Sequence, residues 1–379
     1  MELNTNRKVL FVIDTLEMGG AEQSLLSNAI RFKNIKPVVC HLYTGELLKS
    51  RFIEKGIPVY SVGIQKKYGF RQAYKQLKKI VKTEQPDIMV AYLTRSEFVT
   101  RMVGRLNNIP VVGTFVSDLY SKNYNSALSY KSKLIVSFFK LLNKLTGRFC
   151  KGFIANSEAT KQINAAQLGI PLEKIEVINR GRESKLFVFR SSSLLPGSSI
   201  RFVNVGRLVP VKGQRDIVMA FSKFLLVCPK AVLHIIGEGP GKESLESLIG
   251  ELGLSNSVSL LGAKNDVPQR LSEYDCFVFP SHSEGFSGAV VEAMFAGLPV
   301  LASDIPVNKE VITHLDTGYL FEKGSVESIT NAMDWFKDHL AEAKEMANRA
   351  YEYAKQNYEL DTLVSKMENY LQKKIIEKK

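Results

Sequence analysis

The feature that most constrains this chain is the regular alternation of short, wholly apolar runs with longer amphipathic ones. In the first half the apolar runs are KVLFVID, KPVVCHLY, DIMVAYL and IPVVGTFV, and between them lie segments with apolar residues at helical spacing. Continuous apolar runs are typical of strands buried on both faces, and parallel strands need helical crossovers between them. The alternation therefore predicts an α/β fold with a doubly wound parallel sheet.

The same alternation starts again after a turn-rich stretch, RSSSLLPGSS, at residues 190–199. The later apolar runs are IRFVNVGRL, AVLHIIGEGP, SVSLLGA, DCFVFPS and LPVLASD. A length of 379 residues suits two domains of ordinary size. We therefore expect two Rossmann-like domains that face a cleft, at residues 1–190 and 200–355. The helical segment 356–379 is expected to pack back on the first domain.

The positive net charge is confined to the first half of the chain. Residues 1–190 carry 31 Lys+Arg and 14 Asp+Glu, a net of +17, whereas residues 191–379 carry 20 and 24, a net of −4. This asymmetry indicates an anionic partner for the first domain, either nucleic acid or a membrane surface. Nucleic acid fits less well, because the sequence contains no recognised binding motif for it.

Several classes of protein are disfavoured by composition. No apolar run approaches the ~18 residues of a membrane span, and the N-terminus enters a strand without a signal peptide, so a cytoplasmic protein is expected. The cysteines are scattered, and the five histidines form neither HxH nor HExxH. Neither a disulfide framework nor a metal site is therefore expected. The cysteines are Cys40, Cys150, Cys228 and Cys276.

The first candidate for ligand binding is the glycine pair in DTLEMGGAEQSLL, at Gly19 and Gly20. The pair follows the first predicted strand and opens a helix. Adjacent glycines allow a ligand close to the backbone, and the helix N-terminus offers N–H groups to phosphate. The alternative is a plain turn between strand and helix, because the stretch is not the GxGxxG dinucleotide fingerprint.

The second candidate is VNVGRLVPVKG, where Arg207 and Lys212 follow the first strand of the second domain. Arginine offers a planar fork and lysine a point charge, a combination that suits a diphosphate. The alternative is a solvated pair of surface cations.

The third candidate is PSHSEGFSGAVVEAMFAGLPV, in which Glu284 and Glu292 flank a glycine-rich turn. Diphosphate would repel a carboxylate, so the two glutamates are expected to accept hydrogen bonds from hydroxyls. Glu284 then suits a transferred sugar and Glu292 a ribose diol. The alternative is a capping glutamate plus an exposed one, but Glu292 lies among apolar residues, where an unpaired charge is costly. The N–H groups expected to meet phosphate or sugar oxygens at the helix start are those of Phe286, Ser287, Gly288 and Ala289.

Together these stretches resemble glycosyltransferase family 4, the glycosyl transferases group 1, among the retaining GT-B enzymes. SEGFSGAVVEAMFAGLPVLAS is similar to the family's E-x7-E signature and GRLVPVKG to its GR-x4-KG phosphate clamp. IIGEGP resembles its G-x-GP loop, YDCFVFPS the strand before the signature, and GGAEQ the N-terminal glycine loop. The motifs are in register from Arg7 to Tyr358.

The resemblance implies a retaining glycosyltransferase of hexosyl groups. A nucleotide-diphospho-sugar, with a UDP-sugar favoured, would be held mainly by the second domain and the acceptor mainly by the first. No metal or other cofactor is expected, because the family uses Arg and Lys to neutralise the leaving diphosphate.

Carried over residue by residue, the resemblance gives catalytic roles to three side chains. Arg207 and Lys212 would stabilise the departing phosphates, and Glu284 would bind the donor sugar. Glu292 would bind the ribose. The glycines that would lie against the donor diphosphate are Gly19 and Gly20.

The chain departs from the family at two places on the acceptor side. Many members carry a histidine where this chain has Val116, Ser117 and Asp118, so Ser117 and Asp118 are candidates for the missing polar group. The segment INRGRESKLF replaces the family's N-x-G-[VI]-D and introduces Arg180 and Arg182. These two arginines are expected to touch donor or acceptor charge or, alternatively, to lie on the surface.

Two basic amphipathic segments in the first domain suggest which anionic partner this domain binds. KKYGFRQAYKQLKKIVK spans Lys66 to Lys82, and KSKLIVSFFKLLNKLTGRF spans Lys131 to Phe149. Such helices can lie on an anionic bilayer. The alternative for each is a helix packed on the core with solvated lysines.

These observations predict a cytoplasmic enzyme, peripheral on the inner face of the plasma membrane, that adds sugar to a glycan or lipid-linked acceptor in surface polysaccharide or glycolipid synthesis. Two alternatives remain open. One is a catalytically silent GT-B binding or regulatory subunit, and the other is a sugar-nucleotide epimerase.

Overall fold

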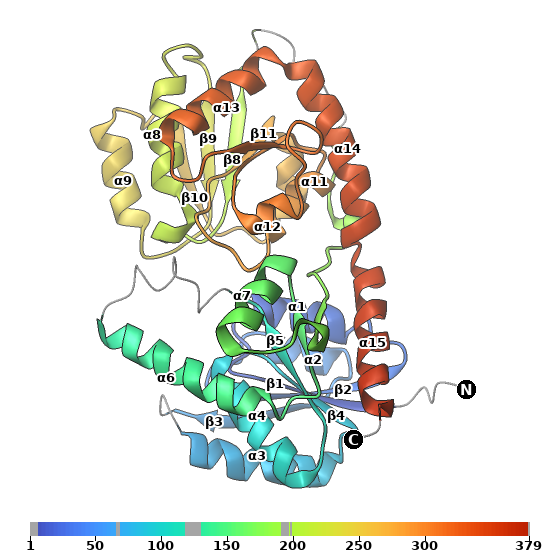
Figure 1. Cartoon of the computed structure of the whole chain (residues 1–379). Helices are drawn as coiled ribbons and strands as arrows, with labels where there is room; N and C mark the ends of the chain where they lie inside the picture. Colours follow the sequence, from blue (N-terminus) through green and yellow to red (C-terminus); the bar gives the residue numbers. More distant parts are fainter. Residues whose placement is uncertain (1–6, 66–68, 118–129, 191–196, 198, 378–379) are drawn as a thin grey trace. The chain divides into compact units, whose positions relative to one another are not determined.

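The computed structural model describes residues 7–65, 69–117, 130–190, 197 and 199–377 (Figure 1). The chain divides into two compact units. The first unit contains residues 1–181 and 360–379, and the second contains residues 182–359. Each unit is built on one parallel sheet, which confirms the doubly wound α/β architecture expected from the sequence.

The first unit has a seven-stranded parallel sheet in the order β3-β2-β1-β4-β5-β6-β7. The strand order reverses between β1 and β4, so the loops that follow these two strands lie at the switch point where ligands bind in such sheets. The strands are β1 (Arg7–Ile13), β2 (Ile35–Tyr43), β3 (Val59–Ile64), β4 (Ile88–Ala91), β5 (Val111–Phe115), β6 (Gly152–Ala155) and β7 (Ile175–Val177).

Helices cover both faces of this sheet, and β1 shows how the sequence assigns them. Leu10 and Val12 belong to one buried core, which α3, α4 and α7 complete, whereas Val9 and Phe11 belong to a second core with α1, α2 and α15. Alternate residues of a strand point to opposite faces, so a wholly apolar strand needs two covers. The helices are α1 (Gly20–Ala29), α2 (Lys49–Glu54), α3 (Phe70–Glu84), α4 (Thr94–Asn107), α6 (Tyr130–Gly147), α7 (Glu158–Leu168) and α15 (Leu360–Ile376).

The C-terminal helix α15 belongs to the first unit. Leu371 is wholly buried in one of the two cores of that unit. The buried carboxylate of Glu368 accepts hydrogen bonds from the backbone N–H groups of Lys33 and Asn34, each at 2.7 Å. Apolar burial and these charge-assisted hydrogen bonds together hold the helix in place.

The second unit has a six-stranded parallel sheet in the order β10-β9-β8-β11-β12-β13. Its order reverses between β8 and β11, so the loops after these strands lie at its switch point. The strands are β8 (Arg201–Val205), β9 (Val232–Ile236), β10 (Val258–Gly262), β11 (Cys276–Phe279), β12 (Val300–Ser303) and β13 (Tyr319–Phe321).

This sheet is also covered on both faces. Phe202 of β8 packs into a core with α8, α9 and α13, and its neighbour Val203 belongs to a core with α11 and α14. The helices are α8 (Gln214–Phe224), α9 (Lys242–Glu251), α10 (Val267–Arg270), α11 (Gly288–Phe295), α12 (Pro306–Lys309), α13 (Val326–Asp338) and α14 (Leu340–Tyr358).

Residues 182–190 join the second unit, although the sequence pattern assigned them to the first. The backbone N–H of Arg182 donates to the carbonyl of Tyr358 at 2.9 Å. The ring of Phe187 stacks on that of Phe295, with centroids 5.7 Å apart. These contacts are formed with residues far along the chain, and the turn-rich stretch 190–199 lies mostly outside the described residues.

The two basic amphipathic segments form helices α3 and α6, and these two helices expose different side chains. Helix α3 turns Leu77 and Val81 into the core of the first unit, so for this helix the core-packed alternative is confirmed. Helix α6 carries large apolar side chains that are exposed instead. Among the helices of the described residues, none is long and apolar enough to cross a membrane.

Candidate functional site

The loops after β8 and β11 bring the predicted donor residues of the second unit together. A 3₁₀ turn at Pro210–Lys212 follows β8 and ends at Gly213, which has φ +68°. A Cβ on Gly213 would overlap the carbonyl oxygen of Pro280, at the end of β11. Only glycine allows this backbone conformation and this approach, so it fixes the Lys212 loop against the Glu284 loop.

Lys212 and Glu284 form an ion pair at this edge of the sheet. The Lys212 ammonium lies 2.5 Å from Oε1 of Glu284, and the two side chains are 20% and 10% exposed. The ammonium also lies 6.0 Å from the centroid of the Phe279 ring. The sequence assigned these two residues to different parts of one donor, and the structure places the two side chains in contact.

Arg207, the third predicted catalytic residue, follows β8 directly and its side chain is exposed. Its backbone carbonyl accepts a hydrogen bond from Nε2 of Gln214 at 3.1 Å. The buried Gln214 amide therefore fixes the backbone of the arginine while its guanidinium extends into solvent. This arrangement leaves the guanidinium accessible to an anionic ligand.

Buried hydroxyl and amide groups hold the loop that carries Glu284. Ser303 donates to the carbonyl of Ser281, and Ser287 donates to Oδ1 of Asn308. Nδ2 of Asn308 donates in turn to the carbonyl of Ser303 at 2.7 Å. Sequence reasoning missed these positioning residues; the only signal was hydroxyl groups at the ends of wholly apolar strands.

His282 provides a further anchor that the sequence did not reveal. Its Nε2 lies 2.6 Å from Oδ2 of Asp216, at the start of α8, and its backbone N–H donates to the carbonyl of Val211 at 2.8 Å. The loops that follow β8 and β11 are therefore joined by side-chain and backbone contacts on both sides of the Lys212–Glu284 pair.

The start of helix α11 presents the predicted anion-binding backbone. Ser287, the N-cap residue, makes no side-chain capping bond to the helix, because its hydroxyl bonds Asn308. Phe286 is buried in the core below, and the N–H of Gly288, the first helical residue, already donates to the carbonyl of Phe286 at 2.9 Å, so the predicted contact of this N–H with a ligand would require it to exchange partners. An uncapped helix N-terminus offers N–H groups to oxygen atoms of a ligand.

Arg182 lies at the same helix start, in the second unit. Its Nε is 2.6 Å from Oε1 of Glu292, and a Cβ on Gly288 would overlap its Nη2 atom. Arg182 therefore lies beside Glu292 and the start of α11, which are the residues predicted to bind the donor. Glu292 is paired with this guanidinium.

In the first unit, the glycine pair begins helix α1 beside groups of both charges. A Cβ on Gly19 would overlap the carboxylate of Glu22, and a Cβ on Gly20 would lie 2.9 Å from Nη1 of Arg180. Glu22 is buried and also accepts a hydrogen bond from the Thr15 hydroxyl at 3.3 Å. A diphosphate at the predicted position would therefore be opposed by the Glu22 carboxylate beside Gly19 and attracted by the Arg180 guanidinium beside Gly20.

A small cavity of about 30 Å³ lies at the carboxyl ends of the strands of the first unit. Arg180, Tyr92 and Asn156 contribute to its lining. Nδ2 of Asn156 donates to the carbonyl of Val116 at 3.1 Å, whereas its buried Oδ1 accepts no hydrogen bond within the described residues. Burial raises the pKa of Tyr92, and Arg180 opposes that rise, so the phenol remains a hydrogen-bond donor at neutral pH.

Ser117 contributes to a second small cavity, of about 40 Å³, together with Glu97. Burial raises the pKa of the Glu97 carboxyl, and the neighbouring Arg101 opposes that rise. The guanidinium of Arg101 lies 3.1 Å from Glu97 and is wholly buried. Asp118, the other candidate for the missing histidine, lies outside the described residues.

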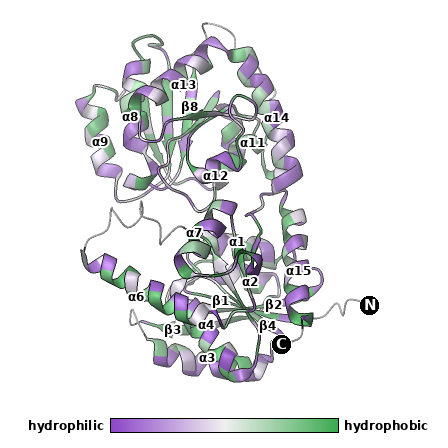
Figure 2. Cartoon of the chain, viewed as in Figure 1, coloured by the Kyte–Doolittle hydropathy of each residue, from purple (hydrophilic) through white to green (hydrophobic). Residues whose placement is uncertain are grey.

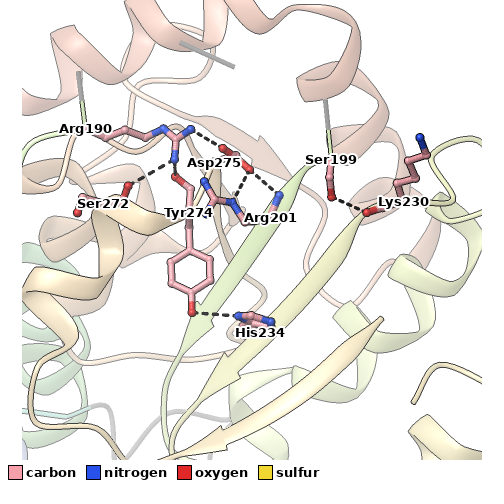
Figure 3. Close-up of polar contacts among 8 residues, drawn as sticks. All are labelled: Arg190, Ser199, Arg201, Lys230, His234, Ser272, Tyr274 and Asp275. Atoms are coloured by element: carbon pink, nitrogen blue, oxygen red, sulfur yellow. Dashed lines mark hydrogen bonds and ion pairs between the residues drawn. The ribbon is translucent and has the colours of Figure 1, made fainter. Parts of the chain in front are cut away.

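A different carboxylate cluster lies at the amino ends of β8 and β11 (Figure 3). Asp275 accepts hydrogen bonds from the guanidinium of Arg190 and, at 2.6 Å, from the backbone N–H of Arg201. Arg190 also donates to the carbonyl of Tyr274. This cluster joins residue 190 to the sheet at the edge opposite the predicted donor site.

Each of the two units matches a known family of glycosyltransferases. Residues 18–185 match the family described as Glycosyltransferase Family 4, and residues 188–357 match Glycosyl transferases group 1. An uncharacterized glycosyltransferase of Methanocaldococcus jannaschii is 28% identical over 62% of this chain and 59% of that protein, so the chain spans less than two thirds of its length. The UDP-Gal:alpha-D-GlcNAc-diphosphoundecaprenol alpha-1,3-galactosyltransferase of Escherichia coli is 28% identical over 68% of each chain.

Solved structures show the same fold. Anabaena HepE in complex with UDP has a TM-score of 0.81 and 23% identity, over 97% of this chain and 100% of that one. The lipopolysaccharide outer core galactosyltransferase WaaB, in its apo form, has a TM-score of 0.74 and 17% identity, over 97% and 99%. These structural likenesses confirm the predicted GT-B fold.

Proposed function

The chain belongs to glycosyltransferase family 4, and on this premise we propose that it transfers a hexosyl group, with retention of anomeric configuration, from a nucleotide-diphospho-sugar to a glycan or lipid-linked acceptor. The observation that supports the proposal most strongly is the Lys212–Glu284 pair at the switch point of the second sheet. Ligands bind at such switch points in open α/β sheets.

The chemistry follows from the charges at this edge. When the bond between sugar and diphosphate breaks, negative charge grows on the leaving phosphate. Lys212 and Arg207 stabilise that charge, and fixed cations of this kind lower the barrier without reorganisation. Glu284, released from part of its contact with Lys212, accepts hydrogen bonds from sugar hydroxyls.

Glu292 binds the ribose diol in this proposal. In the absence of donor, the Glu292 carboxylate is paired with Arg182. The guanidinium already lies at the start of α11, where phosphate oxygens meet backbone N–H groups. When ribose hydroxyls replace it at Glu292, Arg182 can serve as a third cation for the diphosphate. We propose a UDP-sugar as donor, with no metal required, because these side chains neutralise the leaving group.

The acceptor binds in the first unit in this proposal. The unsatisfied Oδ1 of Asn156 suits a donor group such as a sugar hydroxyl, and Arg180 suits an anionic group of the acceptor or donor. Ser117 lines the neighbouring cavity and is the described candidate for the polar group that many relatives supply as histidine.

Two relatives support the lipid-linked class of acceptor. The name of the Escherichia coli enzyme gives a diphosphoundecaprenol acceptor, and that of a Mycobacterium tuberculosis relative, 29% identical over 45% of this chain and 46% of that protein, gives phosphatidylinositol monomannoside. Such acceptors lie in membranes. We therefore propose that the enzyme acts in surface polysaccharide or glycolipid synthesis, in the cytoplasm at the inner face of the plasma membrane.

The test combines binding with product analysis. UDP-, GDP- and ADP-sugars are compared by thermal shift, and we expect UDP-sugars to raise the melting temperature in buffer containing EDTA, because a ligand of the folded state stabilises it. Product from the best donor and a short lipid-linked acceptor is then examined by NMR for anomeric configuration. An inverted linkage, an epimerised donor, or binding without any turnover would each contradict the proposal.

A further inference from the structure

Helix α6 of the first unit exposes a continuous apolar stripe. Leu134, Phe138, Leu141 and Leu145 are 55%, 55%, 55% and 50% exposed. They are separated by four, three and four residues, so they lie on one face of the helix. Apolar residues recur along the length of α6 in Figure 2. Single exposed apolar residues are common on proteins, whereas a contiguous stripe indicates an interaction surface.

The opposite face of α6 carries buried polar side chains beside Val136 and Phe139, which pack on the first unit. Asn143 and Thr146 are both buried, and both accept hydrogen bonds from the guanidinium of Arg101 on α4. Lys140 donates to the side chain of Gln167 on α7. Side-chain hydrogen bonds therefore anchor the helix to the unit while the apolar stripe faces outward.

Cations flank the apolar stripe, and the sequence of α6 contains no Asp or Glu that would offset their charge. Lys131, Lys133 and Lys144 are exposed on α6. The whole stretch from residue 119 to residue 157 contains seven Lys and Arg and no Asp or Glu. An apolar face bordered by cations is complementary to a surface that has an anionic layer over hydrocarbon.

The cationic border continues past the C-terminal end of α6. The guanidinium carbons of Arg148 and Arg105 lie 5.3 and 6.0 Å from the ring centroid of Phe149. The two arginines and Lys151 line a groove of about 830 Å³, and the carboxylates of Asp87 and Glu377 line another part of it. Stacking on the ring limits the freedom of the guanidinium groups, so these cations are held in place beside the groove.

We propose that the outer face of α6 docks on an anionic phospholipid bilayer, with the leucine and phenylalanine side chains among the acyl chains and the lysines at the lipid phosphates. The proposal does not depend on the transfer reaction, because α6 contributes none of the donor-side residues. Helix α3 is equally basic, but it turns its apolar face into the core and can offer only its charges.

The experiment measures flotation of the full chain with vesicles that contain 30 to 40% phosphatidylglycerol in phosphatidylcholine, and with pure phosphatidylcholine vesicles. Three triple variants are compared: K131Q/K133Q/K144Q on α6, K75Q/K79Q/K82Q on α3, and L134Q/F138Q/L141Q on α6. The two lysine variants lose the same charge from exposed positions of the same unit. Glutamine is chosen because it is a good helix former, and thermal melts check that each variant is folded.

We expect the unaltered chain and the α3 variant to float with the anionic vesicles. The α6 lysine variant should bind roughly a hundredfold more weakly, given the attraction of each cation to an anionic surface. The α6 apolar variant should lose binding at physiological salt. Equal losses in the two lysine variants, or full binding by the apolar variant, would overturn the proposal.

A second copy of the chain is the competing occupant of this face. Sedimentation velocity of the unaltered chain and of L134Q/F138Q/L141Q at several concentrations distinguishes it. A dimer that the apolar variant abolishes, together with no flotation of the unaltered chain, would show that α6 is a protein interface and would overturn docking on lipid. Monomers that float only with anionic vesicles support the proposal.

Discussion

The second unit contains two carboxylate–cation clusters at opposite ends of the same strands, and they differ in burial. At the amino ends of β8 and β11, the side chain of Asp275 is 0% exposed and that of Arg190 is 9% exposed. At the carboxyl ends, Lys212 and Glu284 are 20% and 10% exposed, and Arg182 and Glu292 are 27% and 23% exposed. We call Asp275 with Arg190 the closed cluster, because backbone groups complete it, and the two pairs at the carboxyl ends the open cluster, because their side chains are in part exposed.

The two clusters differ in whether the partners of each carboxylate are buried, and from this difference we infer which ion pairs stabilise the fold and which could bind a ligand. The Asp275 carboxylate is wholly buried and accepts hydrogen bonds from Arg190 and from both the backbone and the side chain of Arg201. Each glutamate at the other end has a side chain as its principal partner, and that side chain is also a suitable phosphate ligand. Substitutions in the two clusters are therefore expected to act on different measured quantities.

The largest expected effect is on stability, at the closed cluster. D275N removes the charge that balances the buried Arg190, and the loss of one partner of a buried pair costs about 3 to 5 kcal/mol of unfolding free energy. We expect the melting temperature of the second unit to fall by roughly 10 °C. Differential scanning calorimetry measures it, and the turnover number per folded molecule should remain unchanged at low temperature.

Arg201 supplies the matched control for this prediction. Its side chain is 47% exposed and its Nε lies 3.4 Å from Asp275, while its backbone N–H makes the shorter bond. R201Q keeps that backbone bond and should change stability by less than about 1 kcal/mol. Equal destabilisation by R201Q and D275N would show that burial does not distinguish the members of this cluster.

The next effect is on catalysis, at the open cluster. K212M should lower the turnover number by about a hundredfold to a thousandfold, because it removes a preorganised cation from the leaving diphosphate. Its melting temperature should stay within a few degrees of the unaltered protein, since the Lys212–Glu284 pair is in part exposed to solvent. Steady-state transfer from the donor identified by thermal shift measures the loss.

A matched control for K212M is K242M, at the exposed pair of Lys242 and Glu238 in the same unit. Both variants convert a paired lysine to methionine. K242M should retain full activity and stability. If K212M retained the activity of the unaltered enzyme, or if both variants lost it equally, the assignment of the open cluster to the donor would be wrong.

The sequence predicted the fold and the common sheet edge of Arg207, Lys212 and Glu284, because both follow from local pattern. Alternating apolar runs specify strands and crossovers, and the residues directly after a strand must lie at the edge of the sheet. Arg207, Lys212 and Glu284 follow their strands by a few residues, so their common edge could be inferred without knowing any long-range contact.

The remaining features depend on contacts between distant residues. Arg182 joins the second unit because its backbone pairs with Tyr358, a partner that no local pattern identifies. Helices α3 and α6 have similar amphipathic patterns, yet Asn143 and Thr146 of α6 turn inward to the buried Arg101, and the apolar stripe of α6 stays outside. Local periodicity shows that a helix has two faces, but its neighbours decide which face is buried.

The smallest expected effect concerns Arg182, which the open cluster holds between Glu292 and the start of α11. R182V restores the aliphatic residue that is common in the family at this position. If Arg182 is a diphosphate ligand once ribose has displaced it from Glu292, the variant should bind UDP about fivefold more weakly, a cost of about 1 kcal/mol. Uridine lacks the diphosphate, so R182V should bind it as well as or better than the unaltered chain, because Glu292 no longer has to exchange partners. Isothermal titration with UDP and uridine measures the two affinities separately, and R182K keeps the charge as a control.

Tighter binding of both ligands by R182V would contradict the prediction. It would show that Arg182 only obstructs the ribose site, and the open cluster would then contain two cations for the diphosphate instead of three.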